Sequence, residues 1–188
     1  NESFATWLSH KIIADLKPEF RTAEYLLSDA QVAMKQDSLK SARKIREPIN
    51  KNHDIHNAFD GITYKKGGAV LNMLESYLSP KLFREAVSDH INKFRFGTAS
   101  ASDFLKSLAK KSDASLVKSA ESFLNQNGFP QVFMSYTCKS QGFTIKASQQ
   151  RYVPEGSKPE DKRLWKIPIC IAYGDETNTQ KHCFMMNK

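Results

Sequence analysis

The sequence lacks any apolar run that approaches the length needed to cross a membrane, which excludes a transmembrane helix among its 188 residues. It also lacks internal repeats and low-complexity segments, so neither a repeat array nor a biased linker is expected. No charged segment followed by an apolar stretch opens the chain, and no initiator Met is present. Because the first residues already have the pattern of a helix start, we expect a piece of a longer protein, about whose export the missing signal says nothing.

Acidic residues are fewer than basic ones. Lys plus Arg is 28 and Asp plus Glu is 20, which gives a formal net charge of +8. Such an excess can indicate a nucleic-acid or anionic-membrane partner. The basic residues are spread along the chain, however, and the densest group, Lys40, Arg43, Lys44 and Arg46, is short. We therefore expect a solvated surface and no nucleic-acid partner.

Two periodicities divide the sequence at Gly128-Phe129-Pro130. Before this point, apolar residues recur with the spacing of amphipathic helices; after it, short segments rich in aromatic and branched residues are separated by turn residues. Helices followed by strands without alternation imply two packed units rather than a doubly wound sheet. We therefore predict an α+β fold with a helical domain over residues 1–128 and a β domain over residues 129–188.

Capping and breaking residues bound the predicted helices. These run from Phe4 to Leu16, from about Arg21 to Gln36, from near Tyr64 to Leu78, from Pro80 to Gly97, from a cap at Ser100 or Ser102 through Leu108, and from about Leu116 to Leu124. The segment between residues 37 and 63 has no clear period and is predicted to be irregular. The predicted strands are Gln131–Tyr136, Phe143–Ala147, Trp165–Tyr173 and Lys181–Met186.

Cysteine is scarce, with three residues in the chain. If the last two strands form a hairpin in which Tyr173 faces Gln180, then Cys170 faces Cys183, close enough to bridge. Two buried free thiols are the alternative, and the odd count weakens the case for an oxidising compartment, because Cys138 has no evident partner. We expect a bridge if the parent protein is exported and free thiols if it is cytosolic. The pairing favours a periplasmic or secreted location.

Two segments of the helical part resemble a known enzyme family. The chain opens with Asn-Glu-Ser-Phe-Ala, and residues 59–71 read Phe-Asp-Gly-Ile-Thr-Tyr-Lys-Lys-Gly-Gly-Ala-Val-Leu. These segments resemble the third-zinc-ligand segment and the catalytic-tyrosine segment of the gluzincin aminopeptidases, the zinc exopeptidases that include alanyl aminopeptidases. That family carries its first two zinc ligands and its general base on a His-Glu-x-x-His helix, a motif that this sequence lacks. The resemblance implies a piece of such an enzyme, cut inside the active site.

The resemblance extends over nearly the whole chain. The helical part resembles the later portion of a thermolysin-like catalytic domain, and the turn at Gly128 resembles that family's passage into a small antiparallel β-sandwich. The implied function is hydrolysis of N-terminal residues from peptide substrates, with zinc as the cofactor of the intact enzyme. By itself this chain is expected to hold no zinc and to be inactive, because two ligands and the base are missing.

Glu2 is the candidate metal ligand. A catalytic zinc needs three protein ligands and an open position for water, and a carboxylate at a helix start has a direction fixed by the backbone. The resemblance implies this role for Glu2. By itself, an acidic residue in a first helical turn is explained by the helix dipole. The family usually has Gly after this Glu, whereas this chain has Ser3.

Tyr64 is the candidate catalytic residue. In peptide hydrolysis negative charge develops on the carbonyl oxygen, and a phenol that donates to this oxygen stabilises the transition state more than the ground state. The resemblance implies this role for Tyr64. The alternative is a tyrosine that packs at a helix N-terminus.

A second function class is a non-catalytic module, a helical bundle plus a β-sandwich that binds a protein or an anionic partner. It explains the missing motif without truncation. The histidines do not decide between the classes, since His53 and His56 lie three apart with no Cys, Asp or Glu spacing that would complete a metal site. The sequence that precedes Asn1 would decide, because a His-Glu-x-x-His there identifies the enzyme.

Overall fold

Helices precede strands along the whole chain, as expected for an α+β protein. A computed structural model describes residues 1–139, 142–157, 162–174 and 177–187. The helices are α1 (Glu2–Leu16), η1 (Pro18–Phe20), α2 (Thr22–Asp37), α3 (Asn52–Asn57), η2 (Ile62–Lys66), α4 (Gly67–Leu78), α5 (Pro80–Lys93), α6 (Ala101–Ala109) and α7 (Ala114–Leu124). The strands are β1 (Pro130–Lys139), β2 (Gly142–Arg151), β3 (Ile167–Gly174) and β4 (Thr179–Met186). The predicted α+β class is confirmed.

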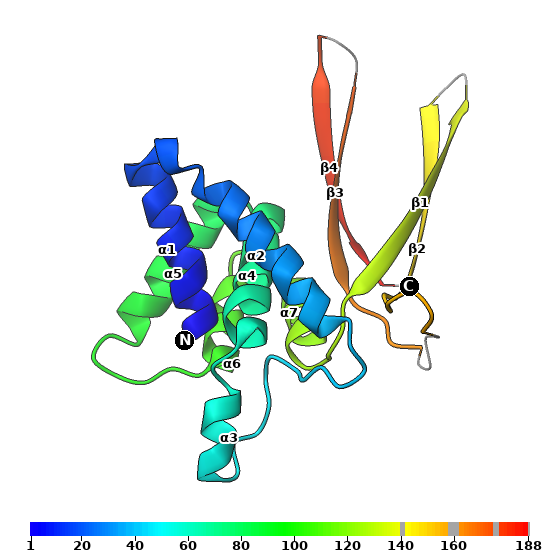
Figure 1. Cartoon of the computed structure of the whole chain (residues 1–188). Helices are drawn as coiled ribbons and strands as arrows, with labels where there is room; N and C mark the ends of the chain where they lie inside the picture. Colours follow the sequence, from blue (N-terminus) through cyan, green and yellow to red (C-terminus); the bar gives the residue numbers. More distant parts are fainter. Residues whose placement is uncertain (140–141, 158–161, 175–176, 188) are drawn as a thin grey trace.

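The strands form two antiparallel two-stranded sheets, β1–β2 and β3–β4. Figure 1 shows the helices gathered into one body, from which both hairpins project toward the same side. No described helix is both long and apolar enough to cross a membrane.

Side-chain caps explain where several helices begin. Ser79 accepts a hydrogen bond from the Leu82 N–H at the start of α5, where Pro80 has no N–H that would need an acceptor. Ser100, one of the two predicted candidates, caps α6: it accepts from the Asp103 N–H, and the Asp103 carboxylate accepts in return from the Ser100 N–H. The Ser100 hydroxyl also donates to this carboxylate, which lowers the pKa of Asp103.

The predicted irregular segment between residues 37 and 63 is wrong in part, because one short helix, α3, forms within it and another, η2, begins at Ile62, just before its end. Asp54 starts α3 by accepting the N–H groups of Asn50 and Lys51. Both helices are too short to show an apolar period, so periodicity could not find them. Strand β1 is also longer than predicted, because its pairing with β2 continues to Lys139 where the apolar alternation has ended.

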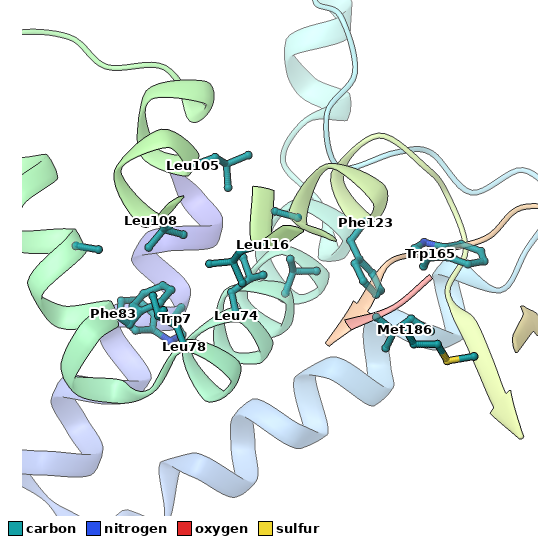
Figure 2. Packing of buried hydrophobic residues seen from close by; sticks show 14 residues of the cluster. Trp7, Leu74, Leu78, Phe83, Leu105, Leu108, Leu116, Phe123, Trp165 and Met186 are labelled. Atoms are coloured by element: carbon teal, nitrogen blue, oxygen red, sulfur yellow. The ribbon is translucent and has the colours of Figure 1, made fainter. Parts of the chain in front are cut away.

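One apolar core joins the helical body to the strands (Figure 2). Its buried members are Trp7, Val70, Leu74, Leu78, Phe83, Ala86, Leu105, Leu108, Leu116, Ala120, Phe123, Trp165, Ile167 and Met186. Hydrogen bonds support the junction, since the Ser119 hydroxyl of α7 donates to the Lys166 carbonyl over 2.7 Å. Helix α7 therefore holds the start of β3 against the helical body.

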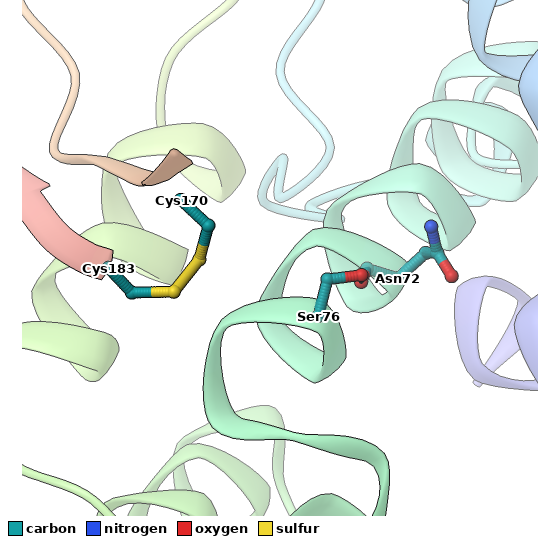
Figure 3. Close-up of a disulfide and its surroundings, with 4 residues drawn as sticks. All are labelled: Asn72, Ser76, Cys170 and Cys183. Carbon is teal, nitrogen blue, oxygen red and sulfur yellow. A yellow bond between two sulfur atoms is a disulfide. The ribbon is translucent and has the colours of Figure 1, made fainter. Parts of the chain in front are cut away.

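The hairpin register predicted for the two cysteines is confirmed. Tyr173 pairs with Gln180 and Cys170 with Cys183, and the two sulfurs are bonded with their Cα atoms 4.0 Å apart. The disulfide is drawn in Figure 3 with Asn72 and Ser76 of α4 in its surroundings. The predicted turn of this hairpin includes residues 175 and 176, which lie outside the described residues.

Reduction of the Cys170–Cys183 bridge should lower the free energy of unfolding by about 2–3 kcal/mol, because the bridge closes a short loop in the unfolded chain. The measurement is chemical denaturation with and without reductant, after thiol labelling and mass spectrometry have established the oxidised state. A Cys138→Ser variant is the matched control, since Cys138 is an exposed free thiol. An equal loss of stability in a Cys170→Ser/Cys183→Ser variant without reductant attributes the effect to this bridge. No loss in either case contradicts the prediction.

Candidate active site

Tyr64 lies on η2, a one-turn π-helix that runs directly into α4. The Gly67 N–H reaches the Ile62 carbonyl five residues back, which is the π pattern. Such turns place one extra residue in a helix, re-aim its side chains and are frequent at functional sites. The Tyr64 side chain is half-buried. The helix predicted to begin near Tyr64 therefore begins close to that residue, at Ile62, but its first turn is a π-helix and the α-helix starts at Gly67.

Asp60 fixes the start of η2. Its Oδ1 accepts the N–H of Ile62 over 2.9 Å and that of Thr63 over 3.1 Å. Arg43 approaches the same carboxylate with two donors, Nε to Oδ2 at 2.9 Å and Nη2 to Oδ1 at 2.5 Å, and also contacts the Thr63 hydroxyl. Burial raises the pKa of Asp60, but the hydrogen bonds from Arg43 and Thr63 outweigh it, so the pKa lies below its usual value.

Helix α2 holds the residues that follow Tyr64. Lys65 pairs with Asp29 over 2.8 Å at a partly exposed position. Lys66 pairs with Asp37 over 2.7 Å, and both side chains are buried. Lys66 Nζ also donates to the carbonyl of Gly128 over 3.0 Å, and Asp37 accepts the Gly128 N–H over 2.7 Å. Burial lowers the pKa of Lys66, and the Asp37 charge opposes this effect.

Glu2 lies in the first turn of α1 and is partly exposed. Its pKa is lowered chiefly by a hydrogen bond from its own backbone N–H. The next residue, Ser3, donates its hydroxyl to the Thr63 carbonyl over 2.7 Å. The structure thus brings the elements that carry Glu2 and Tyr64 into direct contact, at the residues adjacent to each.

A buried carboxylate holds α1 against α4 beyond this contact. Glu75 of α4 accepts the indole N–H of Trp7 over 3.2 Å and pairs with Lys11 over 2.9 Å. The exposed fraction of Glu75 is 5%, so both partners are needed to compensate for the loss of water around its charge. Helix α1 is therefore anchored at Trp7 and at Lys11, both beyond the turn that carries Glu2.

The described residues do not form a complete zinc site. No three His, Cys, Asp or Glu side chains converge anywhere in the described ranges. His53 lies beside Asp54 in the exposed helix α3 and gathers no further ligand there. Glu2 could therefore supply one carboxylate to a metal whose other ligands lie outside the part that the structure describes.

Sequence reasoning missed the residues that support Tyr64. In the sequence, Arg43 is one member of a short basic group and Asp60 one member of the segment that resembles the family, and neither pattern predicts that they support Tyr64. One signal was available for Asp37, because an acidic residue in the last turn of a helix opposes the helix dipole and calls for a cationic partner. Which lysine provides that partner depends on how α2 packs, which the sequence does not reveal.

Comparisons with known proteins agree with the resemblance seen in the sequence. A family model described as "Peptidase family M1 domain" matches residues 1–126. The chain is 31% identical over 95% of its length to "Probable aminopeptidase 1" of Saccharolobus solfataricus. It is 32% identical over 94% of its length to "Alanine/arginine aminopeptidase" of Saccharomyces cerevisiae and 28% identical over 93% to "Aminopeptidase M1" of Arabidopsis thaliana. It spans about a fifth of these relatives, namely 22%, 20% and 19% of their lengths.

Proposed function

Because this chain belongs to the M1 family of peptidases, we propose that it carries part of the active site of a zinc-dependent aminopeptidase. In this proposal the full-length protein removes N-terminal residues from peptides, Tyr64 is a catalytic residue and Glu2 is a metal ligand. The remaining ligands and the general base would come from outside this chain, which by itself would be inactive. Its relatives' printed names support aminopeptidase activity.

The contact between the first turn of α1 and η2 is the observation that carries this proposal. Glu2 and Tyr64 are 62 positions apart by their numbering, yet the residues beside them are joined by the Ser3–Thr63 hydrogen bond. A helix start and a π-turn held together in this way can present a carboxylate and a phenol to one substrate. Neither a helix dipole nor simple packing of a tyrosine requires that the two elements meet.

The proposed role of Tyr64 depends on its fixed backbone. Asp60 and Arg43 hold the segment before it, and Lys65 and Lys66 hold the segment after it. A donor held in this way needs little reorganisation when negative charge develops on the oxygen of the scissile carbonyl. Zinc, when bound, would supply a nucleophilic water and polarise the carbonyl. Tyr64 would donate a hydrogen bond to the oxygen of the scissile carbonyl.

The test is a peptidase assay of the full-length protein on short peptides with free and with N-acetylated termini. We expect release of the N-terminal residue from the free peptides only, loss of this activity with a chelator, and its return with added zinc. Cleavage of blocked peptides at internal bonds would contradict the exopeptidase assignment. No cleavage of any peptide by the zinc-loaded protein would favour the interaction module instead.

Zinc should not bind tightly to residues 1–188 alone, because one carboxylate provides one of the three protein ligands that a catalytic site needs. Calorimetric titration of this chain with zinc should show no stoichiometric site with submicromolar affinity, whereas the full-length protein should show one. A Glu2→Gln substitution in the full-length protein should weaken that site, and a Glu121→Gln substitution on the exposed side of α7 is the matched control. Tight binding by the chain alone would contradict this ligand assignment.

The division of the chain and its location are further parts of the proposal. A helical domain over residues 1–128 and a β domain over residues 129–188 fit the end of α7 and the start of β1. The Cys170–Cys183 bridge supports a periplasmic or secreted location, because structural disulfides persist in oxidising compartments.

A further inference from the structure

We propose that Ser3 is a positioning residue, whose hydroxyl joins the helix of Glu2 to the π-turn of Tyr64 and fixes the separation of carboxylate and phenol. This inference rests on the function proposed above. Glu2 and Ser3 are neighbours in α1, and Thr63 and Tyr64 are neighbours in η2. The Ser3 Oγ donates to the Thr63 carbonyl over 2.7 Å. The hydrogen bond therefore joins the residue that follows Glu2 to the residue that precedes Tyr64.

The Ser3 side chain occupies the space that a side chain on Gly67 would need. A Cβ on Gly67 would lie 2.6 Å from the Ser3 Cβ and closer still to its Oγ, so a side chain at position 67 and the side chain of Ser3 require the same volume. The φ of Gly67 is −61°, which any residue adopts in a helix. Gly67 is therefore needed for this close approach and not for its backbone conformation.

The neighbouring glycine shows how local this constraint is. A Cβ on Gly68 would lie 3.4 Å from the nearest atom, the Thr6 Cγ2, at the edge of ordinary van der Waals contact. Both glycines are buried in the first turn of α4. They differ mainly in which part of Ser3 lies near them: a Cβ on Gly68 would approach only its backbone carbonyl oxygen, at 3.7 Å, whereas a Cβ on Gly67 would overlap its side chain. Gly68 therefore provides a matched control for Gly67.

The hydroxyl of Ser3 acts on the first turn of α1 more than on the fold. Trp7 and Lys11 anchor α1 to Glu75 further along the helix, independently of Ser3. Loss of the hydroxyl would therefore leave α1 in place and loosen only its first turn, where Glu2 lies. The effect of the Ser3 hydroxyl on the position of Glu2 can therefore be measured separately from its effect on the stability of the fold.

The first experiment compares Ser3→Ala, Tyr64→Phe and the double variant in the full-length protein. Ser3→Ala should lower kcat about 10-fold, as supporting hydrogen bonds around active sites typically do, with KM within about twofold and an unchanged melting temperature. In the Tyr64→Phe background the same change should have little further effect, because the separation no longer matters without the phenol hydroxyl. A normal kcat in Ser3→Ala, or fully additive losses in the double variant, would overturn the inference.

A second experiment uses the shared volume. Gly67→Ala should lower kcat by about 10-fold or more, whereas Gly68→Ala should stay within about twofold of the parent protein. With Gly at position 3, the atom nearest to the new Cβ would be the Cα of that residue at 3.6 Å, an ordinary van der Waals contact. Ser3→Gly/Gly67→Ala should therefore recover the kcat of Ser3→Gly alone, even if Gly67→Ala does not fold. Failure to recover overturns the inference.

The kcat of Tyr64→Phe distinguishes failure of the proposed function from failure of the proposed role of Ser3. A normal kcat in this variant would overturn both the proposed function and the role of Ser3. A strongly reduced kcat in Tyr64→Phe, together with a normal kcat in Ser3→Ala, would overturn the role of Ser3 and leave the proposed function standing.

Discussion

Replacing Tyr64 by Phe in the full-length protein should lower kcat about 100- to 1000-fold and leave KM nearly unchanged, because the phenol donates to an oxygen that is charged only in the transition state. Phe keeps the ring and removes only the hydroxyl. The measurement is steady-state kinetics on a short peptide with a free N-terminus, with the zinc content of each variant determined beside it.

The control for Tyr64→Phe is Tyr77→Phe. Tyr77 is a partly buried tyrosine of α4, the helix that follows η2, and it packs against the core. It should keep kcat within about twofold of the parent protein, since it touches no proposed catalytic group. An equal kcat in Tyr64→Phe and the parent protein would exclude the oxyanion role. A rise in KM with an unchanged kcat would instead indicate that Tyr64 binds the substrate equally in its ground and transition states.

Replacing Asp37 by Asn should lower the free energy of unfolding of this chain by about 3–5 kcal/mol, because the buried Lys66 ammonium then loses its only charged partner on α2 while the shape of the side chain is kept. The exposed fractions of the two side chains are 8% for Lys66 and 2% for Asp37, so water cannot replace the lost charge. Urea denaturation followed through the fluorescence of the buried Trp7 and Trp165 measures the change.

This deficit should shrink as the pH rises. Burial lowers the pKa of Lys66 and the Asp37 charge opposes this effect, so removal of that charge should lower the pKa of Lys66 further in Asp37→Asn. Between the lower pKa of the variant and that of the parent protein, only the folded variant binds fewer protons than its unfolded state, so the variant gains stability relative to the parent protein as the pH rises. Glu24→Gln is the control, since Glu24 pairs with Arg21 at the surface and should change stability by about 0.5 kcal/mol or less. A similar loss of unfolding free energy in Asp37→Asn and Glu24→Gln would mean that the buried pair stabilises the fold no more than a surface pair does.

The sequence predicted the elements whose signals are local. Ser79 and Pro80 determine where α5 begins regardless of what packs on it, and a hairpin with Tyr173 opposite Gln180 was sufficient to predict that Cys170 faces Cys183. The choice between Ser100 and Ser102 needed the structure, because both have the right chemistry for a cap. Glu2 and Tyr64 came from a resemblance to a family, and their roles stay predictions.

The parts that could not be predicted depend on distant residues. The π-turn at Tyr64 exists because Asp60 accepts two N–H groups there while Arg43 holds the carboxylate from a segment without any period. The Ser3 hydroxyl meets Thr63 only after α1 and α4 have packed. Such contacts are determined by tertiary packing, which leaves no trace in residue spacing.

The network of Asp37, Lys66 and Gly128 has a consequence for synthesis of the chain on the ribosome. Asp37 and Gly128 are separated by 91 positions, and Lys66 and Gly128 by 62. The buried pair therefore emerges long before the backbone groups that complete its hydrogen bonds, and the loop that joins them closes late and slowly. The Lys66–Asp37 pair of the helical part therefore lacks its hydrogen bonds to the backbone of Gly128 until the link between helices and strands has been made. The hydrogen bonds of this buried pair to Gly128 can therefore form only after the end of the helical part has been synthesised.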